Sequence, residues 1–547
     1  MGYLKITLQS DLCCASGEAF GSSIDSDVCM DEYGIPYLPA KRLKGCLRQR
    51  AEEILPVEII NEIFGTAKNE GCGVAIGNAY IEDYDVIVEA IKAEHVHKNM
   101  ITQLFTSVRS QTKMEEGIAD EGSLRSVRVM NEKSPITGES VVLIANVQLQ
   151  KNQEDLKNVC KALRHIGLNR NRGLGVIRCT YDETSPDKPL ERKQEFIKRL
   201  QQKKITGIHY SVFFETPITL IGADGENEEY IEARAVIGCL AKEWLSKGKP
   251  VDDTFKRLFL SGDVIFSGLY PSYENRPCYP VPAFLQKAKE TKLLFNSLIE
   301  NHSPEKVTPK SIGGFAFQKE NRYKIVKPKS DICYHNSITN KTLYMQESLG
   351  ARQIYSGEIR MPQDCADIIV ALLCNANLRF GRSKTAQYAS CKLCFLEEKK
   401  DDYEENKIKL KEGDFLYVVL NENLLIYNDN GVNTINLQEV KEQIAKDLNM
   451  ADAVDATYND EDVCEYKMVG GYHTLWQLQK PMVKVIKGGS VYCFKIIKDR
   501  EVPMHALVGE NNKEGFGSIR LFSKEQLVKI NLVEKASLQQ RENQQEP

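Results

Sequence analysis

The chain has 547 residues, 42% hydrophobic and 27% charged, and a formal net charge of −4 at pH 7. This length exceeds what one hydrophobic core usually covers, and it predicts about three or four structural units. A slightly acidic chain does not coat nucleic acid indiscriminately, although it can still carry a local basic groove. No apolar run approaches the roughly 18 residues of a membrane span, so we expect a cytoplasmic protein with no membrane partner.

The sixteen cysteines are scattered through apolar segments, which is typical of small buried residues in a large intracellular protein. The one C-x-x-C pair, Cys391 and Cys394, has no partner pair at zinc-finger spacing. The sequence therefore predicts no structural metal site and no resident cofactor.

The chain opens with a predicted strand at 3–9, where polar and apolar residues alternate. A Gly/Ser/Asp-rich loop follows at 15–27. Two prolines then lead into an amphipathic helix that begins near residue 40.

A second helix is predicted to run up to Ile166, because apolar residues recur at helical spacing, with Gly167 as its C-terminal cap. The segment "RNRGLGVIR" at 170–178 is a glycine loop that leads into a strand at 176–181. The polar side of the helix would form one basic stripe. Its members are Lys157, Lys161 and Arg164.

The same theme recurs after a charged stretch at 182–206, which we interpret as a domain boundary. A second opening strand is predicted at 207–216 and a helix at 231–247. A Pro/Tyr-rich loop follows at 266–284, and a further basic glycine element lies at 377–395.

After an acidic connection at 397–406, the pattern predicts a strand at 415–420 and a helix near 437–447. A second glycine loop, "KEGFGSIR" at 513–520, nearly repeats the first. The sequence thus predicts an internally duplicated α+β architecture, in which a glycine loop feeds a strand each time.

These glycine loops do not have the order of a nucleotide-binding site. A phosphate-binding loop runs from strand to helix, so that phosphate meets the helix N-terminus. Here the helix precedes the loop, and no G-x-x-x-x-G-K followed by Ser or Thr occurs in the chain. An NTPase or dinucleotide enzyme is therefore not expected.

Three segments concentrate positive charge without any acid, at 41–50, 156–181 and 375–392. Each is tied to a glycine or proline turn. A solvated helix face would explain any one of them, but three together favour contact with an RNA or DNA backbone.

Several segments resemble the RAMP subunits of type III CRISPR effector complexes. They are "IDSDVCMDEYGIPYLPAKRLKGCLR", "FTSVRSQTKMEEGIADEGSLRSVRVM" and "LRHIGLNRNRGLGVIRC" in the first third of the chain. In the remainder, "GDVIFSGLYPSYENRPCYPVPAFLQKAK", "SLGARQIYSGEIR", "LRFGRSKTAQY" and "EGFGSIRLF" are similar to the long multi-RAMP subunit of subtype III-D.

The resemblance implies an α+β chain of tandem ferredoxin-like (RRM-like, RAMP) domains with glycine-rich loops. The expected division is a first RAMP domain at 1–182, a linker with an exposed helix at 183–206 and a second RAMP region at 207–400. A C-terminal RAMP-like region at 401–536 and a disordered tail at 537–547 complete it. The expected partners are guide RNA near its 5′ handle, target RNA, other RAMP subunits and the large polymerase-type signalling subunit.

The residues expected to contact RNA are the basic side chains of the three segments, two arginines at 125 and 128, and two glycines that permit close backbone approach. They are Lys41, Arg42, Lys44, Arg48, Arg125, Arg128, Arg164, Arg170, Arg172, Gly173, Gly175, Arg379, Arg382 and Lys384. Tyrosines of the 266–284 loop would stack bases or pack against a neighbouring subunit.

Related subunits can cleave target RNA with an Asp in the loop after the first strand, and the matching residue here is Asp25. An Asp in a Gly/Ser-rich loop more often caps a turn. The sequence therefore favours a non-catalytic RNA-binding subunit. The alternative is a metal-dependent endoribonuclease, and only this alternative requires a divalent metal ion.

Overall fold

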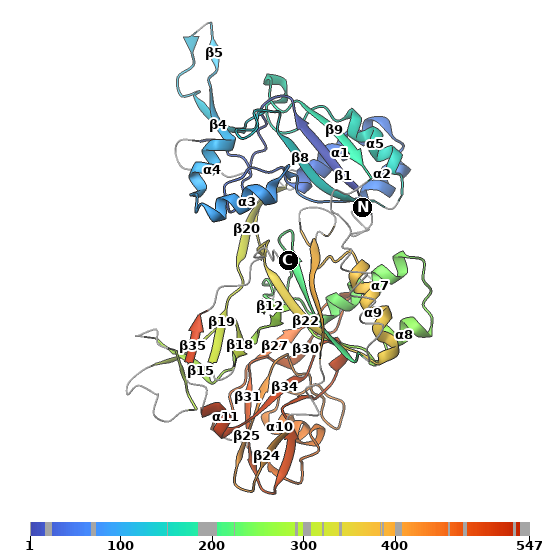
Figure 1. The fold of residues 1–547 in the computed structure, drawn as a ribbon, viewed down its shortest axis with the longest axis vertical. Helices are drawn as coiled ribbons and strands as arrows, with labels where there is room; N and C mark the ends of the chain where they lie inside the picture. The colour runs from blue at the N-terminus through green and yellow to red at the C-terminus, as the bar shows by residue number, and fades with distance from the viewer. Residues whose placement is uncertain are drawn as a thin grey trace. The chain divides into compact units, whose positions relative to one another are not determined.

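The computed structural model divides the chain into two compact units (Figure 1). The first unit contains Met1–Pro189 with Ile332–Ser348 and Arg382–Ser390, and the second contains the rest. The structure describes residues 2–16, 24–66, 73–116, 118–149, 151–183, 205–223, 225–289, 294–298, 308–319, 322–337, 342–382, 384, 388–399, 407–457, 460–473, 478–528 and 532–535.

The first unit is built on an antiparallel sheet with the strand order β2-β8-β1-β9. The opening strand β1 (Gly2–Leu8) lies between β8 (Val142–Gln148) and the closing strand β9 (Ile177–Asp182). Two short strands, β2 (Ala75–Ile76) and β3 (Tyr80–Ile81), pair with β8. We call this sheet with its helices the first domain.

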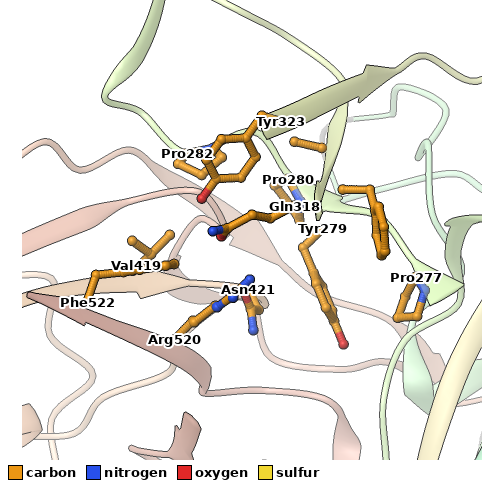
Figure 2. A pocket seen from close by; sticks show the side chains of 12 residues that line it. Pro277, Tyr279, Pro280, Pro282, Gln318, Tyr323, Val419, Asn421, Arg520 and Phe522 are labelled. Atoms are coloured by element: carbon orange, nitrogen blue, oxygen red, sulfur yellow. The ribbon is translucent and has the colours of Figure 1, made fainter. Parts of the chain in front are cut away.

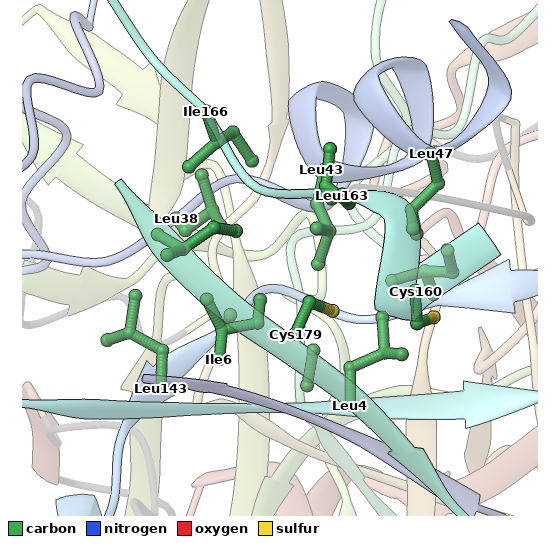
Figure 3. Close-up of a cluster of buried hydrophobic side chains, with 14 of the residues drawn as sticks. Leu4, Ile6, Leu38, Leu43, Leu47, Leu143, Cys160, Leu163, Ile166 and Cys179 are labelled. Atoms are coloured by element: carbon green, nitrogen blue, oxygen red, sulfur yellow. The ribbon is translucent and has the colours of Figure 1, made fainter. Parts of the chain in front are cut away.

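The core of the first domain lies between one face of this sheet and its helices. Alternation along β1 buries Leu4 and Ile6, which share one apolar cluster with Leu43 and Leu47 of a helix (Figure 3). The helices are α1 (Ala40–Ile54), α2 (Val57–Phe64), α3 (Tyr84–Ala93), α4 (Lys98–Phe105) and α5 (Gln153–Ala162).

The predicted end of the second helix was wrong. Helix α5 ends at Ala162, so Arg164 and Gly167 lie beyond it, and the basic stripe contains only Lys157 and Lys161. Ile166 is buried as predicted, but its N–H donates to the carbonyl of Gly175 at 2.9 Å. Because this N–H bonds to the glycine loop and not to a helix carbonyl, Ile166 is not part of the helix.

A long hairpin projects from the first domain (Figure 1). Its arms are β4 (Thr106–Gln111) and β7 (Arg125–Met130), and its outer part is β5 (Met114–Glu115) with β6 (Ile118–Ala119). Apolar side chains such as Met114 and Ile118 are exposed on it.

The second unit contains two further sheets with the same central arrangement. In the second domain, β10 (Gly207–Phe214) lies between β22 (Ile354–Arg360) and β23 (Cys391–Glu398), all antiparallel. On the far side of β22 lie the short strands β11 (Ile265–Phe266), β12 (Tyr270–Tyr273) and β13 (Arg276–Pro277). The helices are α7 (Ala233–Ser246), α8 (Asp253–Phe259) and α9 (Gln363–Asn375).

In the third domain, β25 (Phe415–Leu420) lies between β31 (Val491–Ile496) and β34 (Ser518–Ser523). Strands β26 (Val454–Asp455) and β33 (His505–Leu507) form the edges, and α10 (Leu437–Asp447) is its helix. The ribbon of β24 (Lys407–Leu410) and β32 (Arg500–Pro503) adds Ile408 and Val502 to the same buried cluster.

Smaller β elements complete the second unit. Strands β14 (Tyr279–Pro280), β18 (Phe315–Lys319), β19 (Arg322–Val326) and β35 (Leu532–Lys535) form one sheet. Apolar side chains of β18 and β19 pack against those of β25, β31 and β34. The remaining elements are β15 (Leu285–Ala288), β16 (Leu294–Asn296), β17 (Pro309–Ser311), β27 (Tyr466–Val469), β28 (Tyr472–His473), β29 (Leu478–Gln479), β30 (Val483–Ile486) and α11 (Lys524–Val528). Strands β20 (Ser330–Ser337) and β21 (Thr342–Leu349) form a hairpin, most of which (Ile332–Ser348) groups with the first unit.

The α+β class predicted from the sequence agrees with this mixture of helices and sheets. The tail at 537–547 and all of the 183–206 linker except residues 183, 205 and 206 lie outside the described residues. None of the helices in the described ranges has the length and apolar character needed to cross a membrane.

Candidate nucleic-acid interface

The first glycine loop connects α5 to β9 through a short 3-10 turn, η1 (Arg170–Arg172). Asn169 and Gly173 flank this turn with φ angles of 56° and 79°. Gly175, with a φ of 73°, donates its N–H to the carbonyl of Asp11 at 2.8 Å. The loop is therefore fastened to the chain that follows β1.

The two predicted glycines have different surroundings. A Cβ on Gly175 would overlap the carbonyl oxygen of Ile166, so packing within the loop accounts for this glycine. A Cβ on Gly173 would meet no atom within 4 Å. Gly173 is thus the glycine at which a ligand could approach the backbone.

The basic side chains around this loop are largely exposed. Arg170 and Arg172 are exposed on the 3-10 turn, and Arg164 is exposed just after α5. Lys41 is exposed on α1. Burial raises the pKa of the Cys46 thiol on α1, and the nearby charges of Arg170 and Arg42 oppose this rise. The tip of the loop and the first half of α1 therefore contribute positive charge to one region.

Three of the four basic residues of α1 that were predicted to bind RNA instead make contacts within the protein. Arg42 contacts the Cys14 sulfur at 3.3 Å, and the Lys44 Nζ donates to the carbonyl of Val74 at 2.8 Å. A nitrogen of Arg48 donates at 3.2 Å to the carbonyl of Gly65, the residue that ends α2. These side chains satisfy otherwise open carbonyls and position α1.

Asp25 lies in a loop that is fastened to the β4–β7 hairpin. Its Oδ2 accepts the N–H of Ser126 at 2.7 Å, and its own N–H donates to the Ser126 carbonyl at 2.9 Å. The side chain is nevertheless exposed. Within the described ranges, no group of three or more His, Cys, Asp or Glu side chains is arranged to hold a metal ion.

The two predicted arginines of β7 differ in accessibility. Arg125 is exposed, whereas Arg128 is only 16% exposed and its Nε lies 3.1 Å from the buried carboxylate of Asp27. Asp27 locally neutralises the charge of Arg128, and a buried pair of this kind fixes the hairpin base.

The predicted basic residues near 380 are also dispersed. Burial lowers the pKa of the Arg379 guanidinium, and the nearby Glu215 carboxylate opposes this shift. Arg382 is exposed and Lys384 is half-buried, and both belong to the segment that groups with the first unit. A Cβ on Gly381 would overlap the carbonyl of Thr219, so this glycine has the same packing role as Gly175.

The second glycine loop has nearly the same backbone as the first. Its 3-10 turn η3 (Asn512–Glu514) lies between Asn511 at a φ of 57° and Gly515 at 78°, and Gly517 follows at 75°. A Cβ on Gly517 would overlap the carbonyl of Val508.

The outer side of this second loop is covered by protein. A Cβ on Gly515 would lie 2.7 Å from that of Ala233 on α7, and the Lys513 Nζ donates to the Leu260 carbonyl at 2.6 Å. Here the loop is a contact between two domains of the second unit. Only the first of the two loops leaves its turn exposed and basic.

Sequence reasoning missed the open face of the first sheet. Alternation along β9 places Arg178 and Thr180 on the side away from the helices, opposite Thr7 and Lys5 of β1. The same alternation could have been read from "VIRCTY", because Arg178 is the only charged residue in that strand before Asp182.

The aromatic 266–284 segment is not an open loop, contrary to the sequence prediction. It forms β11 to β14, and the Tyr270 ring is buried and stacks on Tyr230 at 5.1 Å between centroids. Tyr270 is therefore committed to the core and is unable to stack a base.

Of the comparisons with known proteins, the one with a family model agrees with part of the resemblance. No curated protein matches this chain. A chain of the Type III-B Cmr-beta complex bound to cognate target RNA, seen by cryo-EM, is 18% identical over 33% of this chain and 60% of that chain, with a TM-score of 0.24. A chain of the Type III-B Cmr-beta apo state is 12% identical over 33% of this chain and 97% of that chain, also with a TM-score of 0.24. Residues 5–178, which run from β1 through the exposed glycine loop into β9, match the family model of the RAMP superfamily.

Proposed function

We propose that this chain is an RNA-binding subunit of a type III CRISPR antiviral ribonucleoprotein, similar to the long multi-RAMP subunit of subtype III-D. The observation that carries the proposal is the exposed, basic glycine loop 169–175 inside the segment that matches the RAMP superfamily. Guide RNA near its 5′ handle is the proposed ligand. Target RNA, other RAMP subunits and the polymerase-type signalling subunit are the proposed partners.

The proposed architecture is a set of tandem ferredoxin-like domains at 1–182, 207–400 and 401–536. Strand order supports it, because the opening strand of each domain lies next to the closing strand. The orders β2-β8-β1-β9, β12-β22-β10-β23 and β26-β31-β25-β34 are the same when the four strands of each set are ranked by their place in the chain, with the first strand between the third and the fourth. In the third domain, the ribbon of β24 and β32 would stand in for the second helix.

Binding would depend on charge and shape rather than on base identity. Arg170 and Arg172 extend from a turn whose tip carries no opposing carboxylate, and Lys41 and Arg164 are also exposed in the same domain. Such side chains neutralise phosphates and release counterions, which gives affinity without sequence preference. Arg42, Lys44, Arg48 and Arg128 would act indirectly, by holding α1 and the hairpin in place.

The first test is to purify the tagged protein from its native host and sequence the RNA that accompanies it. The proposal expects short RNAs that share one repeat-derived 5′ handle, together with protein partners in the same fraction. Recovery of the protein with its partners but with random RNA fragments would contradict guide binding.

A further inference from the structure

A pocket in the second unit lies between the small sheet of β14, β18 and β19 and the third-domain strands β25 and β34 (Figure 2). Its volume is about 100 Å³. Prolines and aromatic rings form most of the wall, and Arg520 contributes a positive charge.

Arg520 reaches this pocket because of strand alternation. Its neighbours on β34, Ile519 and Leu521, are buried in the helix-side core of the third domain. Arg520 therefore points to the opposite face, where its guanidinium lies 4.9 Å from the Phe522 ring centroid. It is the third residue after Gly517, just as Arg178 is the third after Gly175, so both closing strands place an arginine on the same face.

The charge of Arg520 has no counter-charge among the described residues. No carboxylate of that part of the chain lies within ion-pair distance, and the buried Nε has no hydrogen-bond partner there. Burial lowers the pKa of the Arg520 guanidinium, as expected for a cation held away from water. Arg520 is half-buried as a whole residue, with its Nε atom buried. A charge shielded from water without a partner is costly, and a bound anion would satisfy it.

Neutral hydrogen-bond donors surround this cation. Tyr323 and Tyr279 line the same pocket as Arg520. Burial raises the pKa of both phenols, that of Tyr323 to about 12, so both keep their protons at neutral pH. Asn421 adds a side-chain amide to the lining, and Figure 2 shows these four side chains around one space.

The size of the pocket restricts the ligand. A water molecule takes about 30 Å³ of liquid volume, and a dry cavity of about 150 Å³ accepts benzene. The pocket is therefore large enough for a small oxyanion and too small to enclose a nucleobase. Its donors come from β34, β14, β19 and the residue after β25, and donors on several sides suit a tetrahedral anion better than a planar carboxylate.

We propose that this pocket binds one phosphate group, held by Arg520 with Tyr279, Tyr323 and Asn421 as additional donors. The phosphate comes either from free inorganic phosphate or from a phosphodiester of bound RNA. Only the second source rests on the proposed function.

The test is calorimetric titration of the full chain with inorganic phosphate at constant ionic strength, with chloride as the balancing anion. The wild-type protein should bind one phosphate, and Arg520→Met should weaken this binding by about tenfold to a hundredfold, because a charged hydrogen-bond partner is lost. Arg178→Met is the matched control, since it removes the equivalent arginine from an exposed sheet face, and it should leave phosphate affinity unchanged.

Thermal unfolding without phosphate controls for folding. Arg520→Met should not lower the midpoint, because it removes a charge that has no ion-pair partner among the described residues. Phosphate should raise the midpoint of the wild type only. If Arg520→Met does not fold, Tyr323→Phe is the second variant to titrate with phosphate. It should weaken phosphate binding several-fold. The proposal is overturned by absence of saturable phosphate binding, by equal binding in Arg520→Met and wild type, or by equal binding of acetate.

Competition with a short single-stranded RNA separates the two sources. Displacement of phosphate by RNA, with weaker RNA binding in Arg520→Met, assigns the site to a phosphodiester. Unchanged phosphate binding in the presence of RNA assigns it to the free anion. Loss of RNA binding in the Arg170 and Arg172 variants with intact phosphate binding tests the proposed function separately.

Discussion

The carbonyl oxygen of Ile166 lies where the side chain of any residue other than glycine at 175 would begin. The carbonyl of Val508 has the same relation to Gly517 in the third domain. In both places the carbonyl of the glycine accepts an N–H from the same residue, at 2.9 Å. Two segments more than 300 residues apart in the sequence thus build one loop geometry.

This relation predicts the effects of alanine at the loop glycines. Gly175→Ala and Gly517→Ala should each lower the free energy of unfolding by at least about 3 kcal/mol, because the new Cβ displaces backbone. Gly173→Ala should cost only about 1 kcal/mol, the usual penalty of a left-handed φ, because space beside it is open. Chemical denaturation of the three variants measures this, and equal losses at 173 and 175 would contradict it.

The exposed arginines of the first loop predict a change in salt dependence. Arg170→Ala with Arg172→Ala should weaken RNA binding and lower the slope of log affinity against log salt by about 1.4, or about 0.7 for each single-strand phosphate contact. The matched control is Lys409→Ala with Lys498→Ala, which removes two lysines whose side chains are 84% and 67% exposed in the third domain. An unaltered slope in the arginine variant would assign both arginines a structural role.

Asp25 separates the binding proposal from the nuclease alternative. If the chain is non-catalytic, Asp25→Asn keeps an acceptor for the Ser126 N–H and should leave RNA cleavage by the intact complex unchanged. Asp25→Ala should then lower stability by about 1 kcal/mol, because that hydrogen bond is lost. Cleavage of guide-complementary RNA in divalent metal, measured with both variants, tests this. Loss of cutting in both would establish the nuclease.

A buried ion pair in the third domain predicts a large effect on stability. The Lys441 Nζ lies 2.9 Å from Asp462 and also donates to two backbone carbonyls, and neither side chain of the pair is more than 1% exposed. Lys441→Met should lower the free energy of unfolding by about 3–5 kcal/mol, because it leaves a buried carboxylate unpaired. Lys446→Met, on the exposed side of the same helix, should change it by less than about 0.5 kcal/mol in the same denaturation experiment.

Two half-buried histidines of the second unit, His209 and His505, predict weaker folding in mild acid. Burial lowers the pKa of both His209 and His505 to about 4. The unfolded chain therefore binds more protons than the folded chain between about pH 6.5 and pH 4. Their contribution to stability is full above pH 6.5 and is lost as the pH falls through 4, by on the order of 3 kcal/mol for each histidine.

The measurement is denaturant unfolding of the full chain at several pH values. The charged residues near the two histidines should not be mutated in this experiment. They are Glu358 and Lys399, which form an ion pair beside His209, and Arg520 and Arg360, whose charges act on His505. His505→Gln should reduce the pH dependence in this window, and the same pH dependence in the variant and the wild type would show that His505 does not titrate as expected.

Local sequence patterns predicted many elements well. The strand at 415–420 and the helix at 437–447 match β25 and α10, because one is a continuous apolar run and the other has strict helical spacing and an Asn cap. The opening strand β1 was also expected from its alternation. Such signals come from neighbours in the chain and do not need the rest of the fold.

The basic residues were a weaker guide to the site. Sequence reasoning grouped Lys44 and Arg48 with Lys41, but their partners are carbonyls at residues 74 and 65. A lysine that faces solvent and one that satisfies a distant carbonyl have the same local pattern. The long-range packing of loops decides between them.

The sequence by itself determined the repeated helix–loop–strand theme, the positive-φ glycines and the acid-free charge of residues 156–181. Only the tertiary structure decided which glycine loop remains open. Both loops share one backbone because each glycine must accommodate a carbonyl from its own neighbourhood. The outer side of the second loop is covered because α7 and β11 pack there, and that contact depends on residues more than 200 positions away.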